Sequence, residues 1–138
     1  GTAAIFEDDP RVFTFSMHGA SNYPFHKTGS DLDVALPDRT GDLAYRQALD
    51  AHLDEALDRA RPDLVVYIAG ADVYAGDRLG RLSLSPAGIA ARDRRVFEVL
   101  GRRGLPWAMV MGGGYARPIE ETVAIQIETV RIALRAAR

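Results

Sequence analysis

Residues 64–72 of the chain read Leu-Val-Val-Tyr-Ile-Ala-Gly-Ala-Asp, and this stretch decides the fold. Six apolar residues run without a polar interruption and are followed by a glycine step and a carboxylate. An apolar run of this length is typical of a strand buried on both faces of a parallel sheet. Residues 107–111, Trp-Ala-Met-Val-Met, form a second such run, which ends in three glycines and Tyr115. The two segments therefore predict two parallel strands, each followed by an irregular loop.

Amphipathic segments next to these strands predict three helices. Asp42 is suited to cap the first helix and Pro62 marks its end. Ser85 and Pro86 form an N-cap followed by a proline at the first position of the second helix, which Gly101 or Gly104 would end. Pro118 opens the last helix. The apolar positions of the first helix are Tyr45, Leu49, Leu53, Ala56, Leu57 and Ala60. Those of the second are Ile89, Val96, Phe97 and Leu100, and those of the last are Ile119, Val123, Ile127, Val130 and Leu134.

The start of the chain predicts one more strand. Residues 12–16 are β-branched and aromatic, as strands favour, whereas the polar, irregular stretch from Gly19 to about Gly41 predicts no regular element. Strands and helices then alternate three times along the chain. This order predicts an α/β fold with a parallel sheet and right-handed crossovers.

Composition excludes several classes of function. The 138 residues carry a net charge of −2 and no cysteine, which excludes disulfides, thiolate metal sites and a cysteine nucleophile. The charge gives no broad attraction to nucleic acid or to anionic membranes. No signal peptide pattern is present and no apolar run has the length of a membrane span, so a cytoplasmic location is expected. The basic residues Arg92, Arg94, Arg95, Arg102 and Arg103 are interpreted as solvated helix faces.

Chemistry is expected where the strands end, because ligands of open α/β sheets bind beyond the carboxyl ends of the strands. Asp72 follows the first apolar run, and a carboxylate there is costly unless it is paired, hydrogen-bonded or bound to a cation. A helix N-cap or loop residue is the alternative, and this is our interpretation of Asp77. Tyr115 could donate to a substrate oxygen or could be a packed aromatic residue. His18 could ligate a metal or act as a base, but it is expected to cap the sheet edge or to bond the backbone.

Known phosphate-binding and hydrolase motifs are absent. The glycines at 112–114 match neither a P-loop nor a dinucleotide fingerprint. No nucleophile elbow with a Ser-His-Asp arrangement is visible. His26 and His52 have no partner at metal-ligand spacing.

Taken together, the motifs resemble those of histone-deacetylase-like proteins of the arginase/deacetylase superfamily. Residues 70–72 (Gly-Ala-Asp), with 75–80, 82–85 and Gly88, are similar to the region around the family's second zinc-binding aspartate. Residues 112–115 resemble the glycine run before its catalytic tyrosine. Residues 12–18 and 23–29 resemble the strand before the substrate channel and the channel loop, and residues 30–37 resemble bacterial and class IV-like members. The resemblance covers nearly the whole chain and implies part of a three-layer fold with a parallel sheet.

The resemblance implies roles for individual residues. Asp72 would be a ligand of a catalytic zinc, and Tyr115 would donate a hydrogen bond to the acetyl carbonyl as it becomes an oxyanion. Zinc would polarise that carbonyl and lower the pKa of a bound water. The residues expected to line the substrate are Tyr23, Leu79, Gly113 and Gly114. Structural potassium ions would be held by Ser16 and Met17 at one site, and by the carbonyls of Phe6, Asp9 and Val12 at the other.

Two motifs of the family are missing from the chain. They are the Asp-x-His pair that supplies the other two zinc ligands and the His-His dyad for acid–base work. The chain opens at Gly1 without an initiator methionine and reads like the middle of a folded protein. We therefore expect residues 1–138 to be the C-terminal portion of a single deacetylase domain, which is inactive without its N-terminal portion.

The expected function is that of a zinc-dependent deacetylase acting on an acetylated amine, such as acetyl-lysine, a protein lysine side chain or an acetylpolyamine. No direct contact with nucleic acid or membrane is expected. A manganese ureohydrolase of the same superfamily is a second interpretation, but the additional Asp and His ligands are not found. A non-catalytic interaction module that binds no metal is the alternative from a different class.

Overall fold

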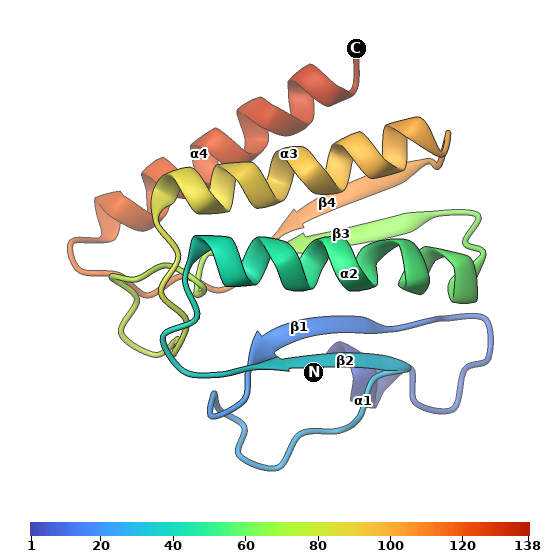
Figure 1. Ribbon diagram of the computed structural model, residues 1–138, viewed down its shortest axis with the longest axis horizontal. Coiled ribbons are helices and arrows are strands. Elements are labelled where there is room, and N and C mark those ends of the chain that lie inside the picture. Colours follow the sequence, from blue (N-terminus) through green and yellow to red (C-terminus); the bar gives the residue numbers. More distant parts are fainter.

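The computed structural model describes residues 1–138; a short first helix and two successive strands come first, and helices and strands alternate after them (Figure 1). Its elements are α1 (Thr2–Ile5), β1 (Phe15–Gly19), β2 (Leu32–Leu36), α2 (Asp42–Ala60), β3 (Val65–Ala69), α3 (Pro86–Arg102), β4 (Trp107–Met111) and α4 (Ile119–Ala136). The strands form two parallel pairs, β1 with β2 and β3 with β4. The predicted α/β fold with parallel strands is confirmed. None of the helices combines the length and the apolar character needed to cross a bilayer.

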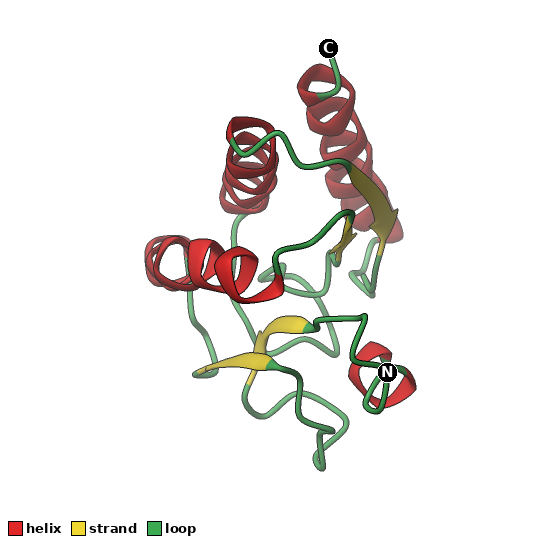
Figure 2. Cartoon of the chain, turned by 90° about the vertical axis from the view of Figure 1, so that its right-hand side faces the viewer, coloured by secondary structure: helices red, strands yellow, loops and turns green.

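The long helices pack on one face of the β3–β4 pair. Tyr67 and Trp107 contact Phe97 of α3 with ring centroids 5.7 and 4.5 Å away. The same strand face meets the leucines of α2 and the side chains of Ile132 and Ala133 in α4. Figure 2 shows these three helices together, with β1, β2 and α1 below them. The chain thus supplies a parallel sheet and one covering layer of helices.

The region before α2 differs from the sequence prediction. The first strand begins at Phe15 rather than Val12 and extends to Gly19, so His18 lies inside it. The predicted irregular stretch contains β2, which pairs with β1 from Phe15↔Leu32 to Gly19↔Leu36. Val34 and Leu36 of β2 are buried, while Asp33 and Ala35, which alternate with them, are exposed. This two-residue period is a strand signal that the polar surroundings concealed.

The starts of α2 and α3 are joined by one carboxylate. Asp42 is not the N-cap of α2, which is Gly41. Instead, Asp42 accepts hydrogen bonds from the Ser85 backbone N–H at 2.8 Å and from its hydroxyl at 2.6 Å. Ser85 caps α3 as predicted, with its Oγ accepting from the Gly88 N–H at 3.0 Å. The predicted apolar stripes of α2 and α3 are buried except for the partly exposed Ala60, and Gly104 follows α3 with a φ of +64°.

The apolar face that the sequence indicates on α4 is not the face that this helix buries within the chain. Its five residues are between 38 and 61% exposed: Ile119, Val123, Ile127, Val130 and Leu134. The helix instead buries a face made of Thr122, Ile125, Thr129, Ile132 and Ala133. The helix therefore has two apolar sides. The side that contains two threonines is the buried one, because Thr129 can hydrogen-bond to α3.

One face of the β3–β4 pair is uncovered as well. Val66, Ile68 and Val110 are between 45 and 57% exposed, so the prediction that these strands are buried on both faces does not hold within this chain. Their side chains alternate with those that contact the helices. The half-buried pattern follows because no layer of this chain covers the second face.

A buried ion pair lies between the sheet and the helices. Arg92 is 5% exposed and its neighbour Asp93 is fully buried, so the prediction of a solvated Arg92 was wrong. Asp93 accepts hydrogen bonds from Arg92 at 2.8 Å, from the Tyr67 hydroxyl at 2.6 Å and from the Thr129 hydroxyl at 2.6 Å. Burial acts against the charge of Arg92, yet Tyr67 and Asp93 raise the pKa of the guanidinium above its usual value. One buried atom lacks a hydrogen bond: Nη2 of Arg92 lies 2.8 Å from Asp93 but forms no hydrogen bond with it or with any other group.

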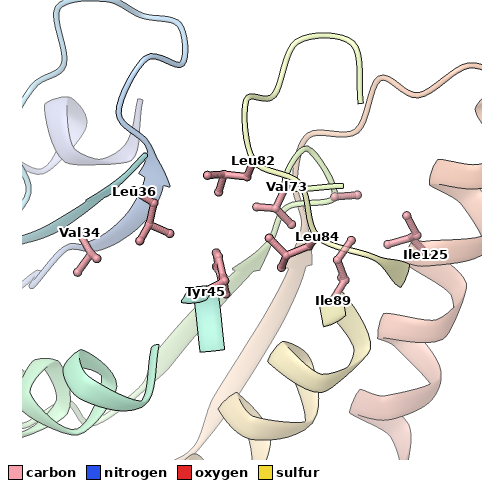
Figure 3. Close-up of a cluster of buried hydrophobic side chains, with 9 residues drawn as sticks. Val34, Leu36, Tyr45, Val73, Leu82, Leu84, Ile89 and Ile125 are labelled. Atoms are coloured by element: carbon pink, nitrogen blue, oxygen red, sulfur yellow. The ribbon is translucent and has the colours of Figure 1, made fainter. Parts of the chain in front are cut away.

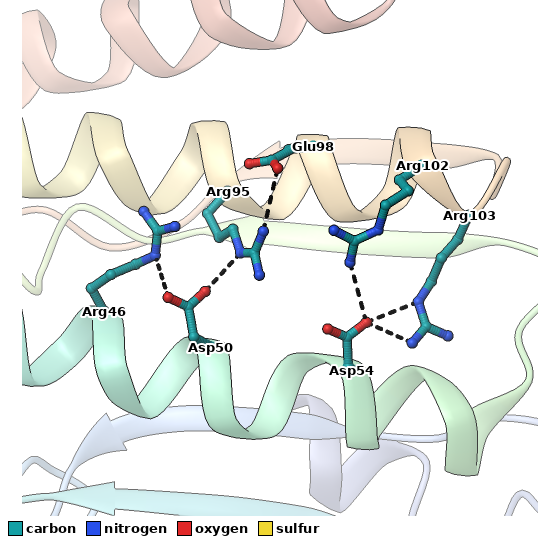
Figure 4. A network of polar contacts seen from close by, with 7 residues as sticks. All are labelled: Arg46, Asp50, Asp54, Arg95, Glu98, Arg102 and Arg103. Carbon is teal, nitrogen blue, oxygen red and sulfur yellow. Dashed lines mark hydrogen bonds and ion pairs between the residues drawn. The ribbon is translucent and has the colours of Figure 1, made fainter.

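Other basic residues of α3 join it to α2 on the surface (Figure 4). Arg95 lies 2.7 Å from Asp50, and Arg103 lies 2.6 Å from Asp54. These pairs are partly exposed, so each adds little to stability. The interpretation of these residues as part of a solvated face holds for Arg94, Arg102 and Arg103, which are exposed, although Arg102 also lies 3.7 Å from Asp54. Arg95 is only partly exposed.

The two kinds of ion pair lead to a prediction about stability. Asp93→Ala leaves Arg92 buried without a counter-charge, and it should lower the free energy of unfolding by about 3–5 kcal/mol. Asp50→Ala removes an exposed carboxylate that also faces an arginine of α3, and it should cost at most about 1 kcal/mol. Urea denaturation followed by circular dichroism measures both values. Equal effects of the two substitutions would contradict the assignment of Asp93 as the central acceptor.

Candidate active site

Asp72 is positioned by its two buried neighbours. Ala71 is 2% exposed and Val73 is 8% exposed, and both belong to a core cluster that also includes Leu84 and Ile89 (Figure 3). The two neighbours anchor the backbone just beyond the end of β3. Asp72 is partly buried between them. It therefore lies at the carboxyl end of the strand, where the sequence placed it.

Glycines on two segments make room for the Asp72 carboxylate. A methyl group at Gly70 would lie 2.6 Å from Asp72 Oδ1, and one at Gly113 would lie 3.2 Å from Cγ. The Ala71 N–H donates a 2.6 Å hydrogen bond to the Gly113 carbonyl. The glycine run after β4 thus packs directly against the loop after β3. The structure brings together the two motifs that the sequence singled out.

The charge of Asp72 is only partly compensated within the chain. Burial raises the pKa of its carboxyl above the ordinary value, and the nearby Asp77 raises it further, while its own backbone N–H and Arg92 act in the opposite direction. No side chain donates a hydrogen bond to this carboxylate. Such a group is suited to binding a cation, which would supply the missing compensation.

Asp77 connects the two loops, a role that the sequence did not reveal. Its Oδ1 accepts hydrogen bonds from the N–H groups of Leu79 at 2.8 Å and Gly80 at 2.7 Å. Its Oδ2 accepts a 2.6 Å hydrogen bond from the N–H of Tyr115. The bonds to residues two and three positions ahead are typical of an aspartate in a turn. The bond to Tyr115 crosses 38 residues of sequence, and no local pattern indicates it.

Tyr115 projects from the end of the glycine run. Its side chain is 50% exposed, so it is not a packed core aromatic. The backbone on its C-terminal side is also held, because the Ala116 N–H donates to the Thr122 hydroxyl at 3.2 Å. An exposed phenol on a restrained backbone is well placed to donate a hydrogen bond to a bound molecule.

The residues predicted to line a substrate channel lie on neighbouring segments. Tyr23 is 84% exposed and Leu79 is 59% exposed. Asn22, next to Tyr23, accepts a 2.9 Å hydrogen bond from the N–H of Arg81, close to Leu79. Lys27, which the sequence analysis did not single out, donates to three carbonyls of the Tyr23 loop at 2.7 to 3.1 Å. The channel role itself stays a prediction.

The predicted potassium ligands lie in the turns before β1 (Phe6, Asp9 and Val12) and within β1 itself (Ser16 and Met17). The carbonyls of Phe6 and Asp9 accept backbone hydrogen bonds of 3.0 Å from Asp9 and Val12. The carboxylate of Asp9 pairs with Arg11 at 2.7 Å, and this hydrogen-bonded pair lowers the pKa of Asp9 to about 2. Met17 packs against the core clusters. The potassium assignments remain predictions.

His18 and Ser16 contact each other within β1. Ser16 Oγ lies 2.9 Å from Nδ1 of His18, and the same nitrogen is 3.9 Å from Asp33. Burial lowers the pKa of His18, while Asp33 opposes the shift. The prediction that His18 caps the sheet edge or bonds the backbone was therefore wrong.

The donor groups of the chain do not make a complete zinc site. No three His, Cys, Asp or Glu side chains come together at positions that could hold a metal ion. Catalytic zinc sites use three protein ligands. Asp72 can supply one of them, so further ligands would have to come from residues outside this chain.

Comparison with known sequences gives a consistent result. The model of the histone deacetylase domain matches residues 1–130. An uncharacterised protein of Picosynechococcus sp. is 49% identical over 123 residues, which are 89% of this chain and 41% of that protein. Histone deacetylase 2 of Arabidopsis thaliana is 35% identical over 126 residues, 89% of this chain and 33% of that protein. The chain therefore spans less than half the length of these relatives.

Solved structures agree with the sequence comparison. An acetylpolyamine aminohydrolase from Burkholderia pseudomallei has a TM-score of 0.69 and 25% identity, with 99% of this chain and 40% of that chain covered. The HD domain of HDA15 has a TM-score of 0.72 and 26% identity, with 97% and 42% covered. A histone deacetylase homologue in complex with SAHA shares the fold with a TM-score of 0.76 at 23% identity, with 100% and 38% covered. The chain is thus part of an arginase/deacetylase fold, and it belongs to the histone deacetylase domain family.

Proposed function

We propose that the protein is a zinc-dependent deacetylase that hydrolyses an acetylated amine, with Asp72 as one metal ligand and Tyr115 as the oxyanion donor. The observation that carries the proposal is the packing of the glycine run against Asp72, with Gly113 beside its carboxylate. Membership of the histone deacetylase domain family supports the reaction class. The similar solved proteins include a histone deacetylase homologue and an acetylpolyamine aminohydrolase, so acetyl-lysine and acetylpolyamines are the first substrates to test.

The role proposed for Tyr115 follows from its exposure and position. Its hydroxyl would donate a hydrogen bond to the acetyl carbonyl oxygen as negative charge develops there, an interaction that is strongest in the transition state. Gly113 and Gly114 would let the substrate approach the backbone, since neither has a side chain. Tyr23 and Leu79 would contact the chain that carries the acetyl group.

We also propose that the rest of the catalytic domain covers the bare apolar faces of this chain. Those faces are the exposed sides of β3 and β4 and the stripe on α4 from Ile119 to Leu134. The similar solved structures match nearly all of this chain, yet this chain covers only 38 to 42% of them. The remaining portion is therefore the proposed occupant of these faces and the proposed source of the other zinc ligands.

The first test concerns the metal. In the full-length protein, Asp72→Ala should abolish zinc binding because it removes the only carboxylate of this region suited to be a ligand. Asp63→Ala, at an exposed loop position, should leave zinc near one per protein. Elemental analysis after dialysis gives the ratio. A full-length wild-type protein without zinc would support the non-catalytic interaction module instead.

The second test concerns the oxyanion donor. Tyr115→Phe should lower kcat about a hundredfold or more, with the zinc content unchanged, because the ring remains and only the hydroxyl is lost. Tyr74→Phe removes a hydroxyl from the neighbouring loop and should retain activity. Steady-state kinetics with acetyl-lysine and acetylpolyamine substrates provide the comparison. Full activity of Tyr115→Phe would refute this role.

The third test concerns the apolar stripe of α4. Co-expression of residues 1–138 with the remaining portion of the domain should give a 1:1 complex in size-exclusion chromatography with light scattering. Val123→Glu combined with Ile127→Glu should prevent it, because two charges would be buried at the contact. Leu43→Glu changes a more exposed apolar residue, on α2, and should not affect the complex. A stable homodimer of this chain that excludes the other portion would contradict the proposal.

A further inference from the structure

The Asp77 carboxylate holds two loops with its two oxygens. Oδ1 accepts the N–H groups of Leu79 and Gly80 at 2.8 and 2.7 Å, which closes the turn within its own loop. Oδ2 accepts the N–H of Tyr115 at 2.6 Å, from the loop after β4. Hydrogen bonds to a charged acceptor at these distances are stronger than those between neutral groups. Asp77 is therefore a bridge between the loop of the proposed metal ligand and that of the proposed oxyanion donor.

The loop that carries Tyr115 has few other hydrogen bonds. Residues 112–114 are glycines, which have no side chains to pack and which leave the backbone unusually free. The Ala71 N–H holds the Gly113 carbonyl on one side, and the Thr122 hydroxyl accepts from Ala116 on the other. Between these points, the Tyr115 backbone is held by Asp77 alone.

The turn that the Asp77 carboxylate closes also contacts the backbone of Asp72. Gly80, held by Oδ1, packs so closely on the Asp72 carbonyl that a methyl group at position 80 would collide with it. A shift of the Asp77 turn would therefore move this contact. Asp77 thus connects the backbones of three segments: that of the proposed metal ligand Asp72, that of the proposed donor Tyr115 and that of Leu79 at the proposed channel.

We infer that Asp77 is a positioning residue for catalysis, which places the Tyr115 hydroxyl over the acetyl carbonyl by holding the Tyr115 backbone. The inference rests on the proposed deacetylase function. Misplacing a catalytic group by about 1 Å can lower a rate by about a hundredfold. Asp77 itself touches neither the substrate nor the metal in this assignment.

A single-atom substitution separates the two functions of the carboxylate. Asp77→Asn keeps one carbonyl oxygen, which can accept from Leu79 and Gly80, but it places an NH2 group opposite the N–H of Tyr115. In the full-length enzyme we expect kcat to fall about tenfold or more, with KM within about twofold and the zinc content unchanged. Asp38→Asn makes the same change at an exposed aspartate in the turn before α2 and should behave as wild type.

A double-mutant comparison distinguishes positioning from general damage. If Asp77 acts through the Tyr115 hydroxyl, Asp77→Asn should lower kcat by less than about twofold in the Tyr115→Phe background. A purely structural role would lower kcat by the same factor in both backgrounds, and that result would overturn the inference. Asp77→Asn with activity within twofold of wild type would also overturn it, while leaving the proposed function intact.

Amide hydrogen exchange provides a measurement that does not depend on activity. In the wild-type protein the N–H of Tyr115 should be protected, and Asp77→Asn should remove this protection while Leu79 and Gly80 keep theirs. An unprotected Tyr115 N–H in the wild type would refute the positioning bond even if Asp77→Asn failed to fold. A wild-type enzyme with bound zinc but no deacetylase activity would instead overturn the proposed function, and the catalytic role of Asp77 with it.

Discussion

The structure depends on the buried pair formed by Arg92 and Asp93. Asp93 binds the hydroxyls of Tyr67 and Thr129 with its two oxygens, and Arg92 donates a 2.7 Å hydrogen bond to the carbonyl of Gly70. These contacts join β3, α3 and α4 at one point directly below the loop of Asp72. Burying two charges is costly, and the cost is offset only when nearly every polar atom has a partner. The pair therefore joins α4 and the end of β3 to α3.

The candidate site follows from this arrangement. Parallel strands end at the same edge of a sheet, so the loops after β3 and β4 are neighbours. Small residues let them touch, and the Asp77 carboxylate joins them. A partly buried carboxylate and an exposed phenol are thereby placed on one rim, with the segments of Tyr23 and Leu79 beside it. In the proposed function these groups would supply only part of the site, because one carboxylate cannot hold a catalytic zinc.

The apolar faces have the same physical origin as the incomplete site. A strand of a parallel sheet needs cover on both faces, and here the residues of β3 and β4 that point away from the helices stay half exposed. α4 likewise has an apolar stripe that nothing in the chain covers. A surface of this kind is costly in water. These exposed apolar faces are the reason why we propose that one additional portion of the domain completes both the core and the metal site.

The sequence by itself determined the elements whose signals are local. The strands β3 and β4, the stripes of α2 and α3 and the Ser85 cap were all readable, because periodicity and capping depend on residues a few positions apart. The placement of Asp72 and Tyr115 at strand ends followed from the same reasoning. Even β2 carried a local signal, since Val34 and Leu36 alternate with exposed residues.

Only the tertiary structure decided which of two plausible faces α4 buries, that Arg92 is buried, and that Asp77 holds Tyr115. Each of these depends on hydrogen bonds between residues 22 to 38 positions apart. The partner of a polar group at such a separation is chosen by the whole fold, because nearly all buried donors and acceptors must be satisfied at once. Local patterns contain no information about that choice.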